Sequence, residues 1–370
     1  MKIIITGGHL TPAMSVIDEI NKKNSNGNIS IVFVGREFAL DSEKTHSLEY
    51  KEITKLNIHF IPLQTGRLNR SISIHSIMNV LKIPLGFMNA WKIIHEQKPD
   101  VVLSFGSYIA LPVVFWAWIY KIPIYTHEQT ISPGFANKII GKLATKIFIA
   151  FEKTRLYFDS RKTILTGNPI RSSVFSIKDI PFEIKKTKPV LYITGGSLGS
   201  HSINEHVSKL LKKLLKSYVV IHQTGSTKEY NDYEDLLKQK EKLSEELRKN
   251  YFIKEHFYEN EIGYIYSKTD LVIGRAGANT FFELIALKIP AIFIPLPWSA
   301  NREQEKHAKF FENNKVGRVF NQSDSSENLM REINKMIINI DEYKNNFTSL
   351  SHLYNHNAAE FIVSQIFTKV

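Results

Sequence analysis

Short runs rich in β-branched residues alternate with helical segments through the whole chain, and this alternation limits the fold more than any other feature of the sequence. Strands that are joined through helices lie parallel in one sheet, with helices on both of its faces. The sequence therefore predicts a parallel α/β architecture. In the first half the predicted strands are Lys2–Thr6, Ile29–Val34, Ile58–Leu63, Val101–Phe105, Ile122–His127 and Lys146–Phe151, and the predicted helices include Pro12–Lys23 and Trp91–Gln97.

The same alternation begins again in the second half. At 370 residues the chain is too long for one ordinary hydrophobic core. We therefore predict two Rossmann-like, doubly wound parallel-sheet domains that face a central cleft. Gly167-Asn168-Pro169 marks the boundary, so we expect domains at 1–167 and 168–349, with a C-terminal helix in 350–370 that packs back on the first domain. The predicted strands of the second half are Pro189–Thr194, Tyr218–His222, Leu271–Gly274 and Ala291–Pro295, and the charged segment Lys228–Asn250 is expected to form a solvated helix pair.

Residues 101–120 carry no formal charge and have the length of a membrane span. Gly106, Ser107 and Pro112 interrupt this stretch. We therefore expect a buried strand, a tight loop and a helix with Pro112 in its first turn, rather than a transmembrane helix.

The formal net charge of +12 calls for an anionic partner, and most of the excess lies in residues 61–170. Nucleic acid is not expected, because the basic residues are not interleaved with aromatics and no reading motif occurs. An anionic bilayer surface or a phosphorylated substrate stays open. The absence of cysteine excludes disulfides and thiolate nucleophiles, and the first residues lack the apolar stretch of a signal peptide, so we expect a cytosolic chain.

A glycine pair follows the first predicted strand. Thr6-Gly7-Gly8-His9 leads into a helix, and such a turn lets a ligand approach the backbone and the free N–H groups at the helix N-terminus. His9 lies where a general base could reach a bound hydroxyl group. From spacing alone, a histidine that only caps the loop is about as plausible.

Two further strand-to-helix turns have the same design in the second half. Gly195–Gly199 could cradle a phosphate, although glycine-rich turns also serve packing. Small residues at 276–278 let the N–H groups near Gly277–Thr280 point at a diphosphate. Glu283 lies about one and a half turns further along the helix, where its carboxylate could accept two ribose hydroxyls. No Asp-x-Asp pair occurs, so we expect neither a bridging metal nor another cofactor.

Taken together, these stretches resemble the MurG family of glycosyltransferases, which add N-acetylglucosamine to the undecaprenyl-linked muramoyl-peptide precursor of peptidoglycan. The resemblance implies the GT-B fold and an inverting, metal-independent hexosyl transfer from UDP-N-acetylglucosamine. It covers nearly the whole chain, in order: Thr6–Ala13, Gly106–Pro112, His127–Gln129, Gly167–Arg171, Gly195–Gly199, His222–Gly225, Arg275–Glu283 and Asn301–Ala308.

The resemblance also implies roles for individual residues. His9 would be the base or would position the acceptor. The ribose hydroxyls would bind Glu283, and the sugar hydroxyls Gln304. The residues implied on the donor side are Arg171, Ser197, Gly277, Ala278, Thr280, Glu283 and Gln304, and those on the acceptor side are Thr6, Gly7, Gly8, Tyr108, Glu128 and Thr130.

The sequence departs from the family pattern in four places. Ile4-Ile5 stand where the first loop usually has two glycines, and Ser107 stands where the second usually has glycine. Thr130 replaces the asparagine that normally follows His-Glu-Gln. Glu303 and His307 replace a glutamine or histidine and an asparagine near the donor sugar.

Members of the family dock on the cytoplasmic face of the membrane through apolar residues ringed by bases. The resemblance therefore implies a peripheral protein with an anionic membrane surface as a partner. An equally plausible alternative is that most of the apolar residues belong to the core. The candidates are Ile72, Ile74, Ile77, Val80, Leu81, Leu85, Phe87 and Met88, with Arg67, Arg70, Lys82, Lys92, Lys138, Lys142 and Lys146 around them.

Two other functions stay open on the sequence. A related transferase could glycosylate another lipid acceptor, and a catalytically silent protein could bind a nucleotide sugar without turnover.

Overall fold

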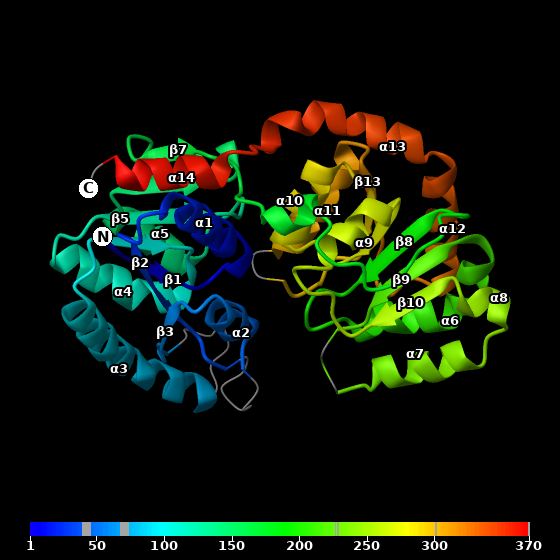
Figure 1. The fold of residues 1–370 in the computed structure, drawn as a ribbon, viewed down its shortest axis with the longest axis horizontal. Coiled ribbons are helices and arrows are strands. Elements are labelled where there is room, and N and C mark those ends of the chain that lie inside the picture. The colour runs from blue at the N-terminus through cyan, green and yellow to red at the C-terminus, as the bar shows by residue number, and fades with distance from the viewer. Residues whose placement is uncertain (39–45, 67–73, 226, 228, 300–301, 369–370) are drawn as a thin grey trace. The chain divides into compact units, whose positions relative to one another are not determined.

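The computed structural model describes residues 1–38, 46–66, 74–225, 227, 229–299 and 302–368. The chain divides into two compact units. The first unit is Met1–Arg171 together with Asn355–Val370, and the second is Ser172–Tyr354 (Figure 1). The predicted pair of doubly wound parallel sheets is confirmed, because each unit is built on one sheet whose paired strands all run parallel.

The sheet of the first unit has seven strands in the order β3-β2-β1-β4-β5-β6-β7. The order runs outward in both directions from β1 and β4, which pair in parallel with Thr6 opposite Ser104. In such a sheet the ligand crevice lies beyond the carboxyl ends of the two strands where the order reverses. The strands are β1 (Lys2–Thr6), β2 (Ser30–Gly35), β3 (His59–Pro62), β4 (Val101–Ser104), β5 (Ile124–Glu128), β6 (Lys146–Ile149) and β7 (Thr163–Leu165).

Helices cover both faces of this sheet, as the alternating side chains of β1 require. Ile3 and Ile5 point into a core shared with α1 and α14, and Ile4 points into a core shared with α3, α4 and α5. The helices are α1 (Leu10–Lys23), α2 (Leu48–Lys55), α3 (Ile74–Gln97), α4 (Ser107–Ile119), α5 (Phe135–Leu143), the 3-10 helix η1 (Glu152–Tyr157) and α14 (Ala358–Phe367).

Helix α14 lies beside α1, although the two are at opposite ends of the chain (Figure 1). Ile362, Val363 and Ile366 of α14 are fully buried in the core that α1 shares. The Lys146 Nζ atom also donates to Gln365 Oε1 over 2.5 Å, which ties β6 to the same helix. The last helix is therefore part of the first unit's core.

The sheet of the second unit repeats the plan with six strands in the order β10-β9-β8-β11-β12-β13. Its order reverses between β8 and β11, where Thr194 lies opposite Gly274. The strands are β8 (Val190–Thr194), β9 (Val219–Gln223), β10 (Tyr251–Lys254), β11 (Leu271–Gly274), β12 (Ala291–Phe293) and β13 (Gly317–Val319).

Side chains of β8 again alternate between two helical layers. Leu191 and Ile193 join a core with α6 and α12, whereas the ring of Tyr192 meets that of Tyr266 in α9 edge-on, with centroids 5.8 Å apart. The helices are η2 (Ser172–Phe175), α6 (His201–Ser217), α7 (Asp232–Glu241), α8 (Glu245–Arg248), α9 (Ile262–Lys268), α10 (Ala278–Leu287), α11 (Glu303–Asn313), α12 (Ser326–Ile338), α13 (Ile340–Asn346) and η4 (Phe347–Leu353).

The ten predicted strands are all present, and the uncharged stretch 101–120 forms a strand, a loop and a helix as expected. The predicted place of Pro112 is wrong, because α4 begins at Ser107 and holds Pro112 in its interior. The sequence analysis missed the three-residue strands β7 and β13 and the edge strand β10. β7 and β13 have only three residues each, and β10 is a four-residue strand, YFIK, that ends in a lysine.

Candidate functional site

In the second unit, the turn from β11 into α10 leaves helical N–H groups open. Gly277 is the N-cap residue of α10, and an added Cβ atom there would meet nothing within 4 Å. The first intrahelical bond of the turn runs from Phe281 N to Gly277 O over 2.9 Å. Among the described residues, no acceptor is recorded for the N–H groups of Ala278, Asn279 and Thr280. A helix start of this kind favours a bound anion.

Glu283 lies on the same helix and is buried, with 2% of its surface exposed. The Tyr266 hydroxyl donates to its Oε2 atom over 2.8 Å. The carboxylate is therefore held in one orientation by a side chain of α9.

The glycine-rich turn after β8 is held on one side by Gln223 and is exposed to solvent on the other. Gln223 Nε2 donates to Thr194 Oγ1 and to Gly196 O over 3.2 and 3.0 Å. Gly196 has a φ of +89° and open space at its Cβ position, and Ser197 is exposed. A ligand can therefore approach the backbone of this turn closely.

Arg275 joins the two turns. Its guanidinium donates to Ile294 O over 2.8 Å, and to Ser200 Oγ, Ser202 Oγ and Gln322 Oε1 over 2.7 to 3.1 Å. All of these acceptors are neutral, and no carboxylate is recorded as its partner among the described residues. Burial lowers the pKa of Arg275 to about 10, so the side chain stays charged at neutral pH. A half-buried cation therefore stands at the carboxyl edge of β11.

Helix α11 closes the same edge of the second sheet. Gln304 Oε1 accepts from Leu296 N over 3.0 Å, and His307 Nδ1 donates to Ala276 O over 3.0 Å. The His307 ring is fully buried and stacks on Phe281, with centroids 4.5 Å apart. Burial lowers the pKa of His307 to about 4. This histidine therefore fixes the turn as a neutral hydrogen-bond donor.

In the first unit, His9 stands at the start of α1 beside the end of β4. Its Nδ1 atom donates to Phe105 O over 2.9 Å. A carbonyl oxygen can only accept, so Nδ1 carries the proton and Nε2 is the ring atom able to take one. The geometry is suited to a general base that acts through Nε2.

The glycine pair before His9 is held by a carboxylate that the sequence did not single out. Glu49 Oε1 accepts from Gly8 N over 3.3 Å, and its Oε2 accepts from Arg36 N over 2.9 Å. Burial raises the pKa of Glu49, although both N–H groups and the Arg36 charge oppose this. One N–H of the first glycine turn is thus already occupied. Thr6, at the end of β1, is buried and its Oγ1 has no recorded partner.

Glu128, at the end of β5, organises the neighbouring loops. Its Oε1 accepts from the N–H and hydroxyl of Thr130 over 2.8 and 2.7 Å, and its Oε2 accepts from Asn137 Nδ2 over 2.6 Å. Asn137 Oδ1 in turn accepts from Ser107 N over 3.0 Å, one residue before Tyr108. Thr130 therefore supplies two donors to Glu128, and the network fixes the start of α4.

His127 precedes Glu128 and is fully buried. Its Nε2 donates to Gly167 O over 3.2 Å, and its Nδ1 has no recorded partner. Burial lowers the pKa of His127 to about 4, and the charge of a protonated His9 adds to this shift. His127 is therefore neutral at physiological pH and lies within electrostatic range of His9.

The structure gathers most of the candidate residues into two groups, one in each unit. The first group contains Thr6, Gly7, Gly8, His9, Tyr108, Glu128 and Thr130. The second contains Ser197, Gly277, Ala278, Thr280, Glu283 and Gln304. Arg171 ends the first of the two segments that form the first unit, so it does not belong to the unit that carries the other donor-side candidates.

Sequence reasoning did not assign Glu49, Asn137, Tyr266 or a role for Arg275. Glu49 and Asn137 lie on helices without any motif, and only the fold brings them to a glycine turn. The position of Arg275 could have indicated a role at the site, because this residue directly follows an apolar strand and precedes the small residues of the turn.

The described ranges of the chain contain no group of three or more histidine, aspartate or glutamate side chains suited to hold a metal ion. None of the helices in these ranges is long and apolar enough to cross a membrane.

Comparison with known families decides the membership of the chain. Residues 3–149 match the glycosyltransferase family 28 N-terminal domain, and residues 190–361 match the glycosyltransferase family 28 C-terminal domain. The chain belongs to glycosyltransferase family 28. A relative from Clostridium novyi (strain NT) is 33% identical over 99% of this chain and 98% of its own length. A relative from Bacillus cereus (strain ATCC 10987 / NRS 248) is 31% identical over 99% of both chains.

Both family 28 relatives carry the name UDP-N-acetylglucosamine–N-acetylmuramyl-(pentapeptide) pyrophosphoryl-undecaprenol N-acetylglucosamine transferase, the second with the suffix 2. Among solved structures, MurG of Acinetobacter baumannii is 22% identical, with a TM-score of 0.68 over the full length of both chains. The UDP-GlcNAc 2-epimerase of Neisseria meningitidis bound to UDP-GlcNAc is 17% identical, with a TM-score of 0.66. These likenesses confirm the predicted GT-B fold.

The burial of His127 predicts a specific dependence of stability on pH. The unfolded chain takes up a proton near pH 6.5, whereas the folded chain resists protonation down to about pH 4. The stability that neutral His127 provides is therefore complete above pH 6.5 and is lost as the pH falls toward 4.

Replacing His127 by Gln keeps an N–H donor for Gly167 and removes the titration. We expect the free energy of unfolding of the wild type to fall, relative to His127→Gln, by roughly 2–3 kcal/mol between pH 7 and pH 4.5. Urea unfolding at the two pH values measures this difference. A difference that does not change with pH would contradict the assignment of a buried neutral ring.

Proposed function

We propose that this family 28 chain transfers N-acetylglucosamine from UDP-N-acetylglucosamine to undecaprenyl-diphospho-muramoyl-pentapeptide, converting lipid I to lipid II in peptidoglycan synthesis. The observation that carries this proposal is the end-to-end match, at 33% identity, to a transferase whose name states both donor and acceptor. The chemistry of the two groups of side chains agrees with it.

The second unit would bind the donor. The open N–H groups of Ala278 and Thr280 and the exposed turn at Ser197 would hold the diphosphate, and Arg275 would add positive charge behind them. Glu283 would accept the ribose hydroxyls, and Gln304 would contact the sugar. As UDP leaves, negative charge grows on the diphosphate, and preorganised N–H groups stabilise it without rearranging. Arg171 stays a donor-side candidate and belongs to the first unit.

The first unit would bind the acceptor, with Tyr108, Glu128 and Thr130 near its sugar and His9 as the base. The acceptor hydroxyl oxygen forms a bond to the anomeric carbon while the bond from that carbon to the UDP oxygen breaks. The hydroxyl proton passes to Nε2 of His9. Attack from the face opposite UDP inverts the configuration at the sugar.

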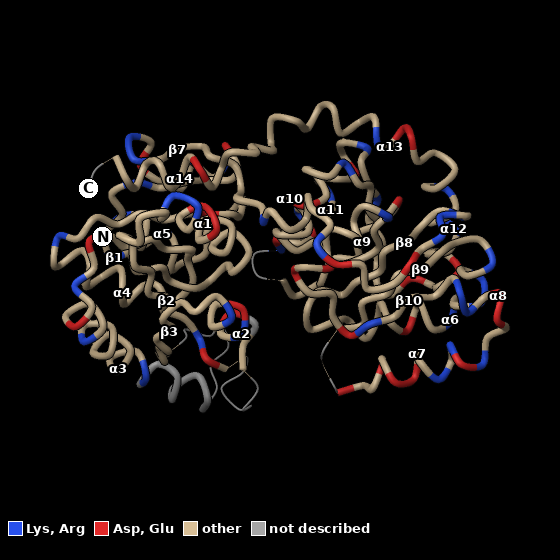
Figure 2. The backbone as a smooth tube through the Cα atoms, in the orientation of Figure 1, with Lys and Arg blue, Asp and Glu red and all other residues tan. Residues whose placement is uncertain are grey.

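The acceptor is a lipid, and the first unit offers a surface suited to a membrane. Leu85, Met88 and Trp91 on α3 are 53%, 58% and 41% exposed, and Trp118 and Ile119 at the end of α4 are 50% and 46% exposed. Trp91 Nε1 donates to Tyr120 OH over 3.0 Å, so the two helices present these residues together. Figure 2 shows basic residues of α3 on either side of an uncharged part of that helix.

We therefore propose peripheral binding to the cytoplasmic face of the membrane. Of the other expected contacts, Arg67, Arg70 and Ile72 lie outside the described residues, as do the side chains of Ile74, Ile77, Val80 and Leu81. Replacing Leu85 and Met88 by Ser should reduce cosedimentation with phosphatidylglycerol vesicles severalfold. Unchanged cosedimentation would mean that these side chains do not meet the lipid.

Release of UDP tests the proposed reaction. Purified protein with UDP-N-acetylglucosamine should release UDP only when a short-chain lipid-linked muramoyl-pentapeptide is added, and a chelator should not abolish the release. Release with other lipid acceptors but not with this one would point to a related transferase. Binding of UDP without turnover on any acceptor would mean that the chain is a catalytically silent protein that binds a nucleotide sugar.

Two variants separate the proposed roles in the same assay. Glu283→Gln should raise the donor KM about tenfold or more, because it removes the charge that holds two hydroxyls. His9→Ala should lower kcat about a hundredfold or more and leave the donor KM within about twofold. A near-normal kcat for His9→Ala would reduce His9 to a loop residue, and an unchanged donor KM for Glu283→Gln would remove Glu283 from the ribose site.

A further inference from the structure

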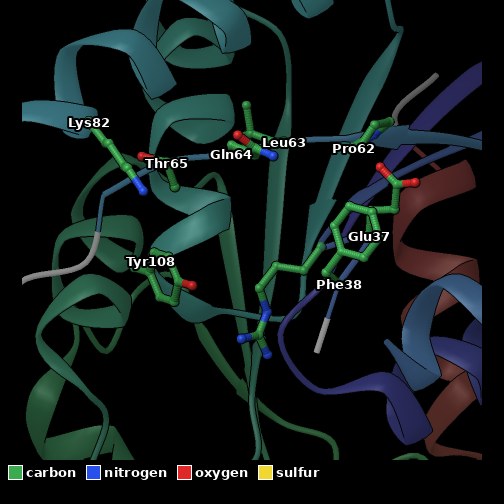
Figure 3. Close-up of a pocket in the computed structure, with 9 residues that line it drawn as sticks. Glu37, Phe38, Pro62, Leu63, Gln64, Thr65, Lys82 and Tyr108 are labelled. Atoms are coloured by element: carbon green, nitrogen blue, oxygen red, sulfur yellow. The ribbon is translucent and has the colours of Figure 1, made fainter. Parts of the chain in front are cut away.

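A small pocket lies in the first unit beyond the carboxyl ends of β2 and β3 (Figure 3). Its volume is about 110 Å³, which suits a compact ionic group. It is lined by Arg36, Glu37, Phe38, Pro62, Leu63, Gln64, Thr65, Lys82 and Tyr108.

Two cations line this pocket. Arg36 directly follows β2 and Lys82 lies on α3, and both side chains are exposed. Among the described residues, neither side chain forms a recorded hydrogen bond or ion pair. The pocket has one carboxylate in its lining, Glu37, whose Oε1 atom lies 4.0 Å from His46 Nδ1. Figure 3 shows that carboxylate on the opposite side of the pocket from Lys82 and Tyr108.

Neutral donors complete the polar lining. The Tyr108 hydroxyl, the Thr65 hydroxyl and the Gln64 amide lie around the same space as Lys82 (Figure 3). Arginine and lysine beside hydroxyl and amide donors are the groups that bind phosphate oxygens in proteins. The chemistry of the lining therefore points to a phosphate ester.

One carboxylate connects this pocket to the loop that carries His9. Glu49 accepts from the backbone N–H of Arg36 and from that of Gly8, so both segments are held at a fixed spacing. The same contact occupies the Gly8 N–H. A Cβ atom at Gly7 would lie 1.9 Å from Glu49 Oε1, which places the carboxylate against the glycine turn. The Gly8 N–H is therefore not available to a ligand anion, whereas two cations line the neighbouring pocket.

Lys82 connects the pocket to one end of the apolar surface, because it lies on α3 three residues before exposed Leu85. A ligand that joins a lipid chain to a sugar through phosphate would extend from α3 through the pocket toward His9.

We propose that this pocket binds the diphosphate of the lipid-linked acceptor, with Arg36 and Lys82 as its two cationic contacts. The assignment rests on the proposed transferase function and adds a subsite to it. The first glycine turn then positions His9 and the acceptor sugar, and the phosphate charge is neutralised one strand further along the sheet.

Farnesyl diphosphate is a soluble probe for this subsite. It should inhibit the transferase competitively with the acceptor, and it should bind the protein in calorimetry without any turnover. In the double variant Arg36→Gln/Lys82→Gln, its affinity and that of the acceptor should each fall about tenfold or more, while the Kd for UDP stays unchanged. Lys51→Gln, which removes an exposed lysine of α2 outside the pocket, serves as the matched control.

Each of these binding measurements has a result that would overturn or support the proposed diphosphate site. Equal affinity of the wild type and the double variant for farnesyl diphosphate would overturn the proposal. Displacement of the probe by phosphatidylglycerol vesicles would also overturn it, because the pocket would then bind phospholipid headgroups. Farnesyl monophosphate should bind more weakly than the diphosphate. If the wild type shows no turnover but binds farnesyl diphosphate through these residues, the transferase function fails and the diphosphate site stands.

Discussion

The parallel pairing of β8 with β11 in one unit, and of β1 with β4 in the other, is the constraint on which the rest of the structure depends. At each pair the strand order reverses, so the connections on the two sides diverge and leave a crevice at the carboxyl edge. Each pair ends beside glycine turns that run into α6, α10, α1 or α4. In the second unit this register brings the open N–H groups at the start of α10 and the glycine turn after β8 to one edge of the sheet.

Neutral hydrogen bonds around buried ionisable groups hold these edges in shape. The Arg275 partners among the described residues are neutral oxygens, and Glu128 accepts from Thr130 and Asn137. His127 and His307 stay uncharged because burial lowers their pKa to about 4. A charge that is fixed but not neutralised remains available to a ligand of opposite sign. Such preorganisation is what stabilises a developing charge without rearrangement.

The sequence predicted the two sheets well because a buried parallel strand is a continuous apolar run, and both units contain several. It also predicted the turns, since a glycine pair after a strand has few structural uses. It could not predict Glu49 or Tyr266, because Glu49 reaches the glycine turn only through the packing of α2, and Tyr266 reaches Glu283 only through the packing of α9 near α10. The threonine at position 130, a departure from the family pattern, still makes two bonds to Glu128 and so keeps a polar role.

We propose that the β8–β11 edge of the second unit binds the nucleotide sugar through open backbone N–H groups. Hydrogen exchange with and without UDP-N-acetylglucosamine tests it directly, because N–H groups without an acceptor exchange fast and become protected when a phosphate accepts from them. We expect slower exchange in residues 195–200 and 276–283 of the intact chain when the sugar nucleotide is bound. Binding of the sugar nucleotide with no change of exchange in these two segments would contradict it.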